Sequence, residues 1–110
     1  MLSKKDLIET NKMWHTGKVS SEGSLDFAVS HTARSKNWLR VAAVFTRAIL
    51  VDHIFEDGNK RTAATVIATL MRMHGVEPSE EAIYKIVIII AKKNIISITT
   101  IERMITHARV

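Results

Sequence analysis

The sequence predicts an all-α domain of about six helices, and three observations lead to this prediction. Apolar residues recur at helical spacing through most of the 110-residue chain. One proline and four glycines leave few positions that force a break in a helix. Serine or threonine precedes several of the periodic segments, where its side chain can cap a helix. The length fits a single domain over residues 1–110, because two halves would each be too small for a core.

The amino-terminal half is expected to hold three helices separated by polar stretches. Ser3 is placed to cap a first helix that runs to about Trp14. Residues 15–24 are polar and small, which predicts a loop or a short hairpin. Ser24 is a plausible cap for a second, short helix, and a long apolar segment over residues 38–55 predicts a buried helix.

Three further helices are expected in the second half. The first covers residues 60–74, with Gly75 as its stop. The β-branched run 86–90 would also suit a buried strand. A serine followed by two glutamates starts this segment and two lysines end it, which favours a helix because the charges match the helix dipole. Thr99 and Glu102 can form a capping box for the last helix.

Composition and charge narrow the classes of function. The chain is 46% hydrophobic and 25% charged, the ordinary balance of a soluble globular protein. It has no cysteine, which excludes disulfides and thiolate metal sites. The net charge of +5 suits an anionic partner, but the basic residues are scattered and form no tract interleaved with aromatics. Nucleic acid is therefore not the expected partner.

No membrane or export segment is expected. Charged residues occupy the first positions, where a signal peptide needs an apolar core. No apolar run approaches the roughly 20 residues that span a bilayer. We therefore expect a cytoplasmic protein.

The segment from His53 to Arg61 lies between two long helical patterns and forms a helix–loop–helix junction. Gly58 and Asn59 mark the break, because both residue types tolerate the backbone angles of a tight loop. The helix that follows begins with free N–H groups and the positive end of its dipole, which together bind anions. Lys60 and Arg61 add cations at that end, where the dipole disfavours them unless an anion binds. A phosphate is the expected anion.

The same segment holds the other groups that phosphoryl or nucleotidyl transfer requires. Asp57 offers an oxygen ligand for Mg²⁺ beside the anion site. His53 can take a proton near neutral pH. Phe55 is expected to turn inward and fix the loop on the core. Each of these residue types, taken alone, more often has a structural role, and the whole set could be no more than a capped turn between two helices. Packing, however, does not require Lys60 and Arg61 at a helix start, whereas phosphoryl transfer requires positioned positive charge.

The pattern His-x-Phe-x-Asp-Gly-Asn-Lys-Arg at residues 53–61 closely resembles the signature of the Fic/Doc (Fido) family. The continuation Thr62-Ala63 and the stretch as far as residue 108 look like the Doc (death-on-curing) branch of toxins. The resemblance covers roughly residues 38–108, while the first 37 residues match loosely in character. It implies a Fido-type bundle of about six helices, in which a β-hairpin flap binds the target. Residues 15–24 could be that flap or a connector, and the two readings are equal.

The resemblance also implies roles for individual residues. His53 would deprotonate a hydroxyl of a target protein, and Asp57 would hold Mg²⁺. Phe55 would anchor the loop. Ile54 departs from the proline common in the wider family. The phosphates of ATP would lie in a cradle made by Gly58, Asn59, Lys60 and Arg61.

Two positions bear on the group that is transferred. AMP-transferring relatives carry glycine in place of Lys60 and a second arginine in place of Ala64. Doc-type relatives carry lysine at the first position, which is associated with a reversed ATP and transfer of its γ-phosphate. The resemblance thus favours phosphorylation of a Ser or Thr hydroxyl, with a translation elongation factor as target by family analogy alone. Transfer of AMP is the alternative within enzymes, and an inactive binding module the alternative outside them.

The inhibitory pattern of the family, Ser/Thr-x-x-x-Glu-Gly/Asn, is not complete in this chain. Glu22-Gly23 is the single candidate ending, and Lys18 stands where the hydroxyl residue should be. The resemblance therefore implies a separate antitoxin, whose disordered tail could fold into a groove.

Two other groups of residues favour structural roles. The remaining histidines show no metal-ligand spacing, and the two tryptophans are more typical of core or hairpin supports than of stacking platforms. These residues are His15, His31, His74, His107, Trp14 and Trp38.

Overall fold

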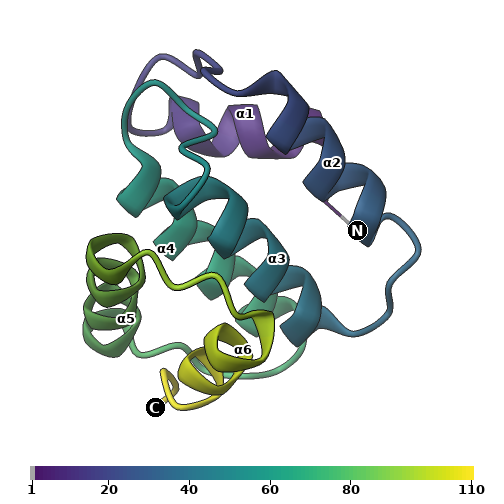
Figure 1. The fold of residues 1–110 in the computed structure, drawn as a ribbon. Coiled ribbons are helices and arrows are strands. Elements are labelled where there is room, and N and C mark those ends of the chain that lie inside the picture. The colour runs from purple at the N-terminus through teal and green to yellow at the C-terminus, as the bar shows by residue number, and fades with distance from the viewer. Residues whose placement is uncertain (1) are drawn as a thin grey trace.

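A computed structural model describes residues 2–110 and confirms the all-α prediction (Figure 1). Within these residues there are six α-helices and no sheet. The helices are α1 (Lys4–Lys12), α2 (Glu22–Thr32), α3 (Trp38–Leu50), α4 (Asn59–Met73), α5 (Glu80–Lys93) and α6 (Ile98–Thr106).

Helix α3 is the centre of the bundle and packs against α2, α4, α5 and α6. Every residue from Val41 to Leu50 except Arg47 is buried, so the helix is apolar around most of its circumference. Figure 1 shows α1 and α2 on one side of α3, and α5 and α6 on the other. The apolar segment predicted from the sequence is therefore the core of the fold.

Helices α1, α3, α5 and α6 start after a serine or asparagine whose side chain caps the helix, and two helix starts differ from the prediction. The Ser3 side chain caps α1 in a capping box with Asp6, and Ser79 caps α5, both as expected. Helix α6 begins after Ser97, whose hydroxyl accepts the N–H of Thr100, so Thr99 and Glu102 lie inside the helix and form no box.

Helix α2 begins after Ser21 rather than Ser24. The Ser21 N–H donates to the carbonyl of Ile54 at 3.1 Å, while its own carbonyl accepts the N–H of Leu25 at 3.2 Å. The start of the helix is thus set by contact with a distant loop. Sequence periodicity does not contain that information.

The helix ends also divide into expected and unexpected cases. Gly75, at φ +74°, ends α4, and the Val76 N–H reaches back to the Met71 carbonyl at 2.9 Å, a Schellman arrangement. Residues 86–90 are helical, so the strand alternative is excluded. Helix α1 stops at Lys12, two residues before Trp14. Helix α3 stops at Leu50 rather than near Phe55. His53, at φ +50°, is not helical, and Ile54 and Phe55 after it are buried.

Residues 15–24 contain no hairpin of their own; they pair with the loop between α3 and α4. Val19 forms an isolated antiparallel bridge with Phe55. The Ser20 N–H donates to the Ile54 carbonyl at 2.7 Å, and the Glu56 N–H donates to the Lys18 carbonyl at 3.0 Å. The amino-terminal segment therefore braces the loop that carries the sequence motif.

Ion pairs join the first two helices. The Lys4 ammonium lies 2.6 Å from Glu22 and 3.0 Å from Asp26 on α2. The Glu22 carboxylate, followed by that of Asp26, holds the pKa of Lys4 above its ordinary value. Within residues 2–110, no helix combines the length and the apolar character that crossing a membrane requires.

Candidate functional site

All the predicted site residues except Phe55 line one cavity of about 400 Å³. These residues are His53, Asp57, Gly58, Asn59, Lys60 and Arg61, and they are joined by His15, Leu50, Glu56, Tyr84 and Ala91. The motif is therefore an open site at the start of α4, with further walls from α5 and from the segment after α1.

His53 lies in a turn that few residue types adopt. Its φ is +50°, in the left-handed region. This conformation costs a residue with a Cβ roughly 1–3 kcal/mol, and such strained residues cluster at functional sites. The turn follows the end of α3. The next two residues, Ile54 and Phe55, lie in the core, where they are 0% and 1% exposed. The imidazole is left exposed at the cavity.

Asn59 closes the loop with its side chain. Its Oδ1 accepts the Phe55 N–H at 3.1 Å, and its Nδ2 donates to the Phe55 carbonyl at 2.9 Å. Phe55 is buried beneath, as expected for an anchor. The side-chain amide of Asn59 is thus used to hold the loop. Only the backbone N–H of Asn59 is left to contribute to the anion site at the start of α4.

The first turn of α4 has the features of an anion site. Its N-cap is Gly58, which has no side chain to accept the first N–H groups, and the turn contains no acidic residue. The first helical N–H groups have no partner inside the helix, and the dipole makes this end positive. Lys60 and Arg61 are both exposed there. The N–H groups and the two cations together suit an anion with several oxygens, such as a phosphate.

Asp57 has one carboxylate oxygen engaged and one facing its neighbours. The Gly58 N–H donates to Oδ1 at 2.9 Å, while Oδ2 lies 3.7 Å from Nδ1 of His15. Across residues 2–110, no group of three or more His, Cys, Asp or Glu side chains could hold a metal. Mg²⁺ needs only one or two carboxylates when phosphate oxygens and waters complete its shell. Asp57 therefore fits Mg²⁺ together with a nucleotide, and does not fit a metal held by protein alone.

Asn11, which lies outside the sequence motif, connects α1 to this site through hydrogen bonds. Its side chain is 1% exposed. Nδ2 donates to the Asp57 carbonyl at 2.9 Å and to Oγ1 of Thr62 at 3.0 Å, and Oδ1 accepts the Gly17 N–H at 2.9 Å. One signal could have found it: Asn11 follows the buried Leu7 by four residues, so it is a polar residue on the inner face of the helix.

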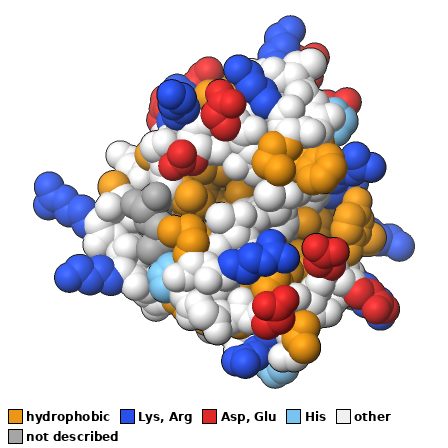
Figure 2. All heavy atoms as spheres, turned by 180° about the vertical axis from the view of Figure 1, so that it is seen from behind, with side chains coloured by type: hydrophobic (Ala, Val, Ile, Leu, Met, Phe, Trp, Pro, Cys, Tyr) orange, Lys and Arg blue, Asp and Glu red, His pale blue; other side chains and the backbone are white. Residues whose placement is uncertain are grey.

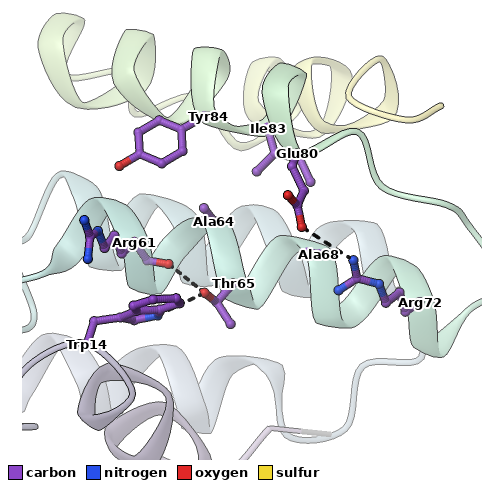
Figure 3. A pocket seen from close by; sticks show the side chains of 9 residues that line it. All are labelled: Trp14, Arg61, Ala64, Thr65, Ala68, Arg72, Glu80, Ile83 and Tyr84. Carbon is purple, nitrogen blue, oxygen red and sulfur yellow. Dashed lines mark hydrogen bonds and ion pairs between the residues drawn. The ribbon is translucent and has the colours of Figure 1, made fainter.

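A second cavity of about 500 Å³ adjoins the first along α4 and α5 (Figure 3). We call it the α4–α5 groove. It is lined by Trp14, Arg61, Ala64, Thr65, Ala68, Arg72, Glu80, Ile83 and Tyr84, of which Arg61 and Tyr84 also line the first cavity. Figure 2 shows the rear face of the molecule, where patches of hydrophobic side chains lie among charged ones of both signs.

The groove overturns the expectation for Trp14. Trp14 is no core support: it is 45% exposed, its indole N–H donates to Oγ1 of Thr65 at 3.3 Å, and the Arg61 guanidinium lies 5.4 Å from its ring centroid. Ala64 and Ala68 on α4 are half-buried and line the groove. Short side chains at these two positions keep the groove open between α4 and α5.

Replacing Gly58 with alanine is expected to disturb the site more than the same change elsewhere. Gly58 has φ +74°, and an added Cβ would lie 2.0 Å from Cδ2 of His15. We expect Gly58→Ala to lower the free energy of unfolding by about 2 kcal/mol or more, from left-handed strain plus displacement of the imidazole. Urea denaturation measures it.

Gly75 provides the matched control, since it has the same φ of +74° with open space where a Cβ would lie. Gly75→Ala should therefore show the backbone strain alone, about 1–2 kcal/mol. Adding His15→Ala to Gly58→Ala should recover the difference. Equal losses for the two glycines would show that His15 does not pack on Gly58 in solution.

Removing the Asn11 amide is expected to destabilise the fold. Asn11→Leu keeps the volume but leaves the Gly17 N–H and the Asp57 carbonyl without their partner. The free energy of unfolding should fall by about 2–4 kcal/mol, because each buried unpaired group costs about 1–3 kcal/mol. The control Asn37→Ala removes an exposed cap of α3 and should cost about 1 kcal/mol. A cost for Asn11 no larger than that for Asn37 would contradict the network.

The comparisons with known proteins assign no family to this chain. No family model matches it, and no curated protein matches it. The resemblance of residues 53–61 to the Fic/Doc signature thus stays a prediction.

Proposed function

We propose that this chain is a Doc-like cytoplasmic toxin that transfers phosphate from ATP to a Ser or Thr hydroxyl of a target protein, by resemblance a translation elongation factor. The observation that carries the proposal is the cavity at the start of α4. It brings the proton acceptor His53 and the carboxylate of Asp57 to an uncapped helix end that carries the two cations Lys60 and Arg61. A turn with a purely structural role between two helices does not require this combination of residues.

The transfer can be written with the residues of the cavity. The target hydroxyl oxygen forms a bond to the γ-phosphorus of ATP, and the bond from that phosphorus to the β–γ bridging oxygen breaks. His53 accepts the hydroxyl proton, and ADP leaves with the electron pair of the broken bond. The N–H groups at the start of α4, with Lys60 and Arg61, stabilise negative charge on the phosphates. Mg²⁺ held by Asp57 would supply further charge neutralisation when bound.

The preference for phosphate over AMP rests on two positions. Lys60 is exposed and lines the cavity, and Ala64 lines the adjoining groove. AMP-transferring members of the resembled family carry glycine and arginine there. A lysine in the first turn of α4 adds a mobile positive charge beside the helix end, and alanine at the next turn adds none. These differences support transfer of the γ-phosphate.

The α4–α5 groove is the place we propose for an antitoxin segment. Its apolar walls include Ala68 on α4 and, across the groove, Ile83 and Tyr84 on α5. Arg61 lies at one border, and the ion pair of Arg72 with Glu80, at 3.9 Å, lies at the other. An amphipathic helix with acidic residues fits these walls and the net charge of +5. Because Arg61 and Tyr84 belong to both cavities, an occupant of the groove would also obstruct the nucleotide.

The transferred group is tested with ATP labelled at the α or the γ position and a purified elongation factor as acceptor. We expect protein-bound label from γ-labelled ATP alone. His53→Asn should reduce transfer about a hundredfold or more, because the proton acceptor is lost. Asparagine tolerates the left-handed turn, so the unfolding temperature should hold.

Label from the α position alone would replace the kinase with an AMP transferase. Full transfer by His53→Asn would remove His53 from its role. An unfolding temperature that does not rise when Mg²⁺ and ATP are added would contradict the proposal that this chain is an ATP-dependent enzyme, since a ligand of the native state raises apparent stability.

The groove is tested with Ala68→Arg, which places a long charged side chain between α4 and α5. The probe is the small protein encoded beside this gene, where an antitoxin reading frame is expected. Its affinity should fall at least about tenfold, or about 1.4 kcal/mol. Thr69→Arg is the control, since Thr69 is exposed on the same helix and does not line the groove. Equal effects of the two variants would place the contact elsewhere.

A further inference from the structure

His15 is the second histidine that lines the motif cavity, and it comes from outside the motif. Its side chain is 30% exposed, and Nδ1 lies 3.7 Å from Oδ2 of Asp57. In residues 2–110, neither ring nitrogen of His15 has a hydrogen-bond partner. By contrast, Nδ1 of His74 and of His107 each lies 2.8 Å from a helix carbonyl, and His31 stacks on Phe27. His15 and His53 are the two histidines that line the motif cavity, where a ligand can reach them.

The position of His15 is held by the fold. Its backbone N–H donates to the Asn11 carbonyl at 2.8 Å, while the Asn11 side chain holds the Asp57 carbonyl and the Gly17 N–H on either side. The imidazole then lies against Gly58, where a Cβ would meet three of its ring atoms within 2.8 Å. Asn11 thus sets His15 and Asp57 at a defined separation, and glycine at position 58 leaves the room for the ring.

The separation leaves both groups with hydrogen-bonding capacity for a third atom beside them. At 3.7 Å, the imidazole and the carboxylate are too far apart for a direct hydrogen bond. An oxygen that lies beside the pair, about 2.8 Å from each of the two atoms, can hydrogen-bond to both of them. Mg²⁺ keeps several waters when it binds through one carboxylate and phosphates, and such waters are held by neighbouring side chains.

We propose that His15 is a further ligand-binding residue of this cavity, whose imidazole hydrogen-bonds an oxygen of the Mg²⁺–triphosphate unit beside Asp57. The inference rests on the proposed function and extends the site to the segment after α1. The oxygen belongs either to a water on Mg²⁺ or to a phosphate. His15 positions the nucleotide and takes no part in proton transfer from the target.

The experiment is calorimetric titration of ATP into the wild-type chain and into the pair His15→Leu and His15→Gln. Leucine fills the space without a hydrogen bond, whereas glutamine can form one. With Mg²⁺ present, we expect His15→Leu to weaken ATP binding about tenfold or more, as for other residues that support a metal shell. His15→Gln should recover most of the affinity. Both variants should keep the wild-type unfolding temperature, which separates binding from folding.

Titration in EDTA identifies the oxygen. A loss confined to Mg²⁺ assigns it to a metal-bound water, and a loss in both conditions assigns it to a phosphate. Wild-type affinity in His15→Leu, or equal weakening in both variants, overturns the inference. If the wild-type chain binds ATP and His53→Asn lacks transfer while His15→Leu binds normally, only the role of His15 fails. If the wild-type chain binds no ATP, the proposed function fails as well.

Discussion

The geometry of the site depends on one buried amide, that of Asn11. Its three hydrogen bonds join α1, the loop after α3 and the first turn of α4, which are otherwise separate parts of the chain. Thr62 continues the network, because its hydroxyl donates to the Gly58 carbonyl at 2.8 Å. A buried polar group stabilises a structure only in the arrangement that satisfies all its bonds. Asn11 therefore specifies how the motif loop is placed against α1, more sharply than apolar packing could.

Several features of the site oppose the stability of the fold. His53 adopts a left-handed turn, α4 begins without a side-chain cap, and Lys60 and Arg61 lie at the positive end of a dipole. The four helices α1, α3, α5 and α6 have side-chain caps, so the fold does not lack the means to cap a helix. Local rules of stability are broken where these residues meet in one cavity, which is the pattern expected of a functional site. A bound polyanion would offset the unfavourable charge.

The sequence predicted the parts of the fold that depend on local pattern. Helical periodicity, the Ser79 cap and the Gly75 stop are local, and they predicted α4 and α5 to within a residue of their bounds. The motif residues are contiguous from His53 to Arg61, so their gathering in one cavity follows from a single loop. The residues that were missed reach the site from far along the chain. Asn11 contacts Asp57 and Thr62 across 46 and 51 residues, and Trp14 contacts Thr65 across 51. The early end of α3 has the same origin, since it is the pairing of residues 18–21 with residues 54–56 that holds the loop extended.

The two cavities share a wall, and this gives the proposed inhibitor a direct route to the proposed chemistry. Arg61 stands at the start of α4, where the phosphates are expected, and its guanidinium also lies over the ring of Trp14 in the α4–α5 groove. One guanidinium cannot adopt the best geometry for a phosphate and for the groove's occupant at once. A segment bound in the groove that draws Arg61 toward itself would weaken nucleotide binding, and by linkage a bound nucleotide would weaken the segment to the same degree. No distant conformational change is required, because the shared side chain is itself the coupling.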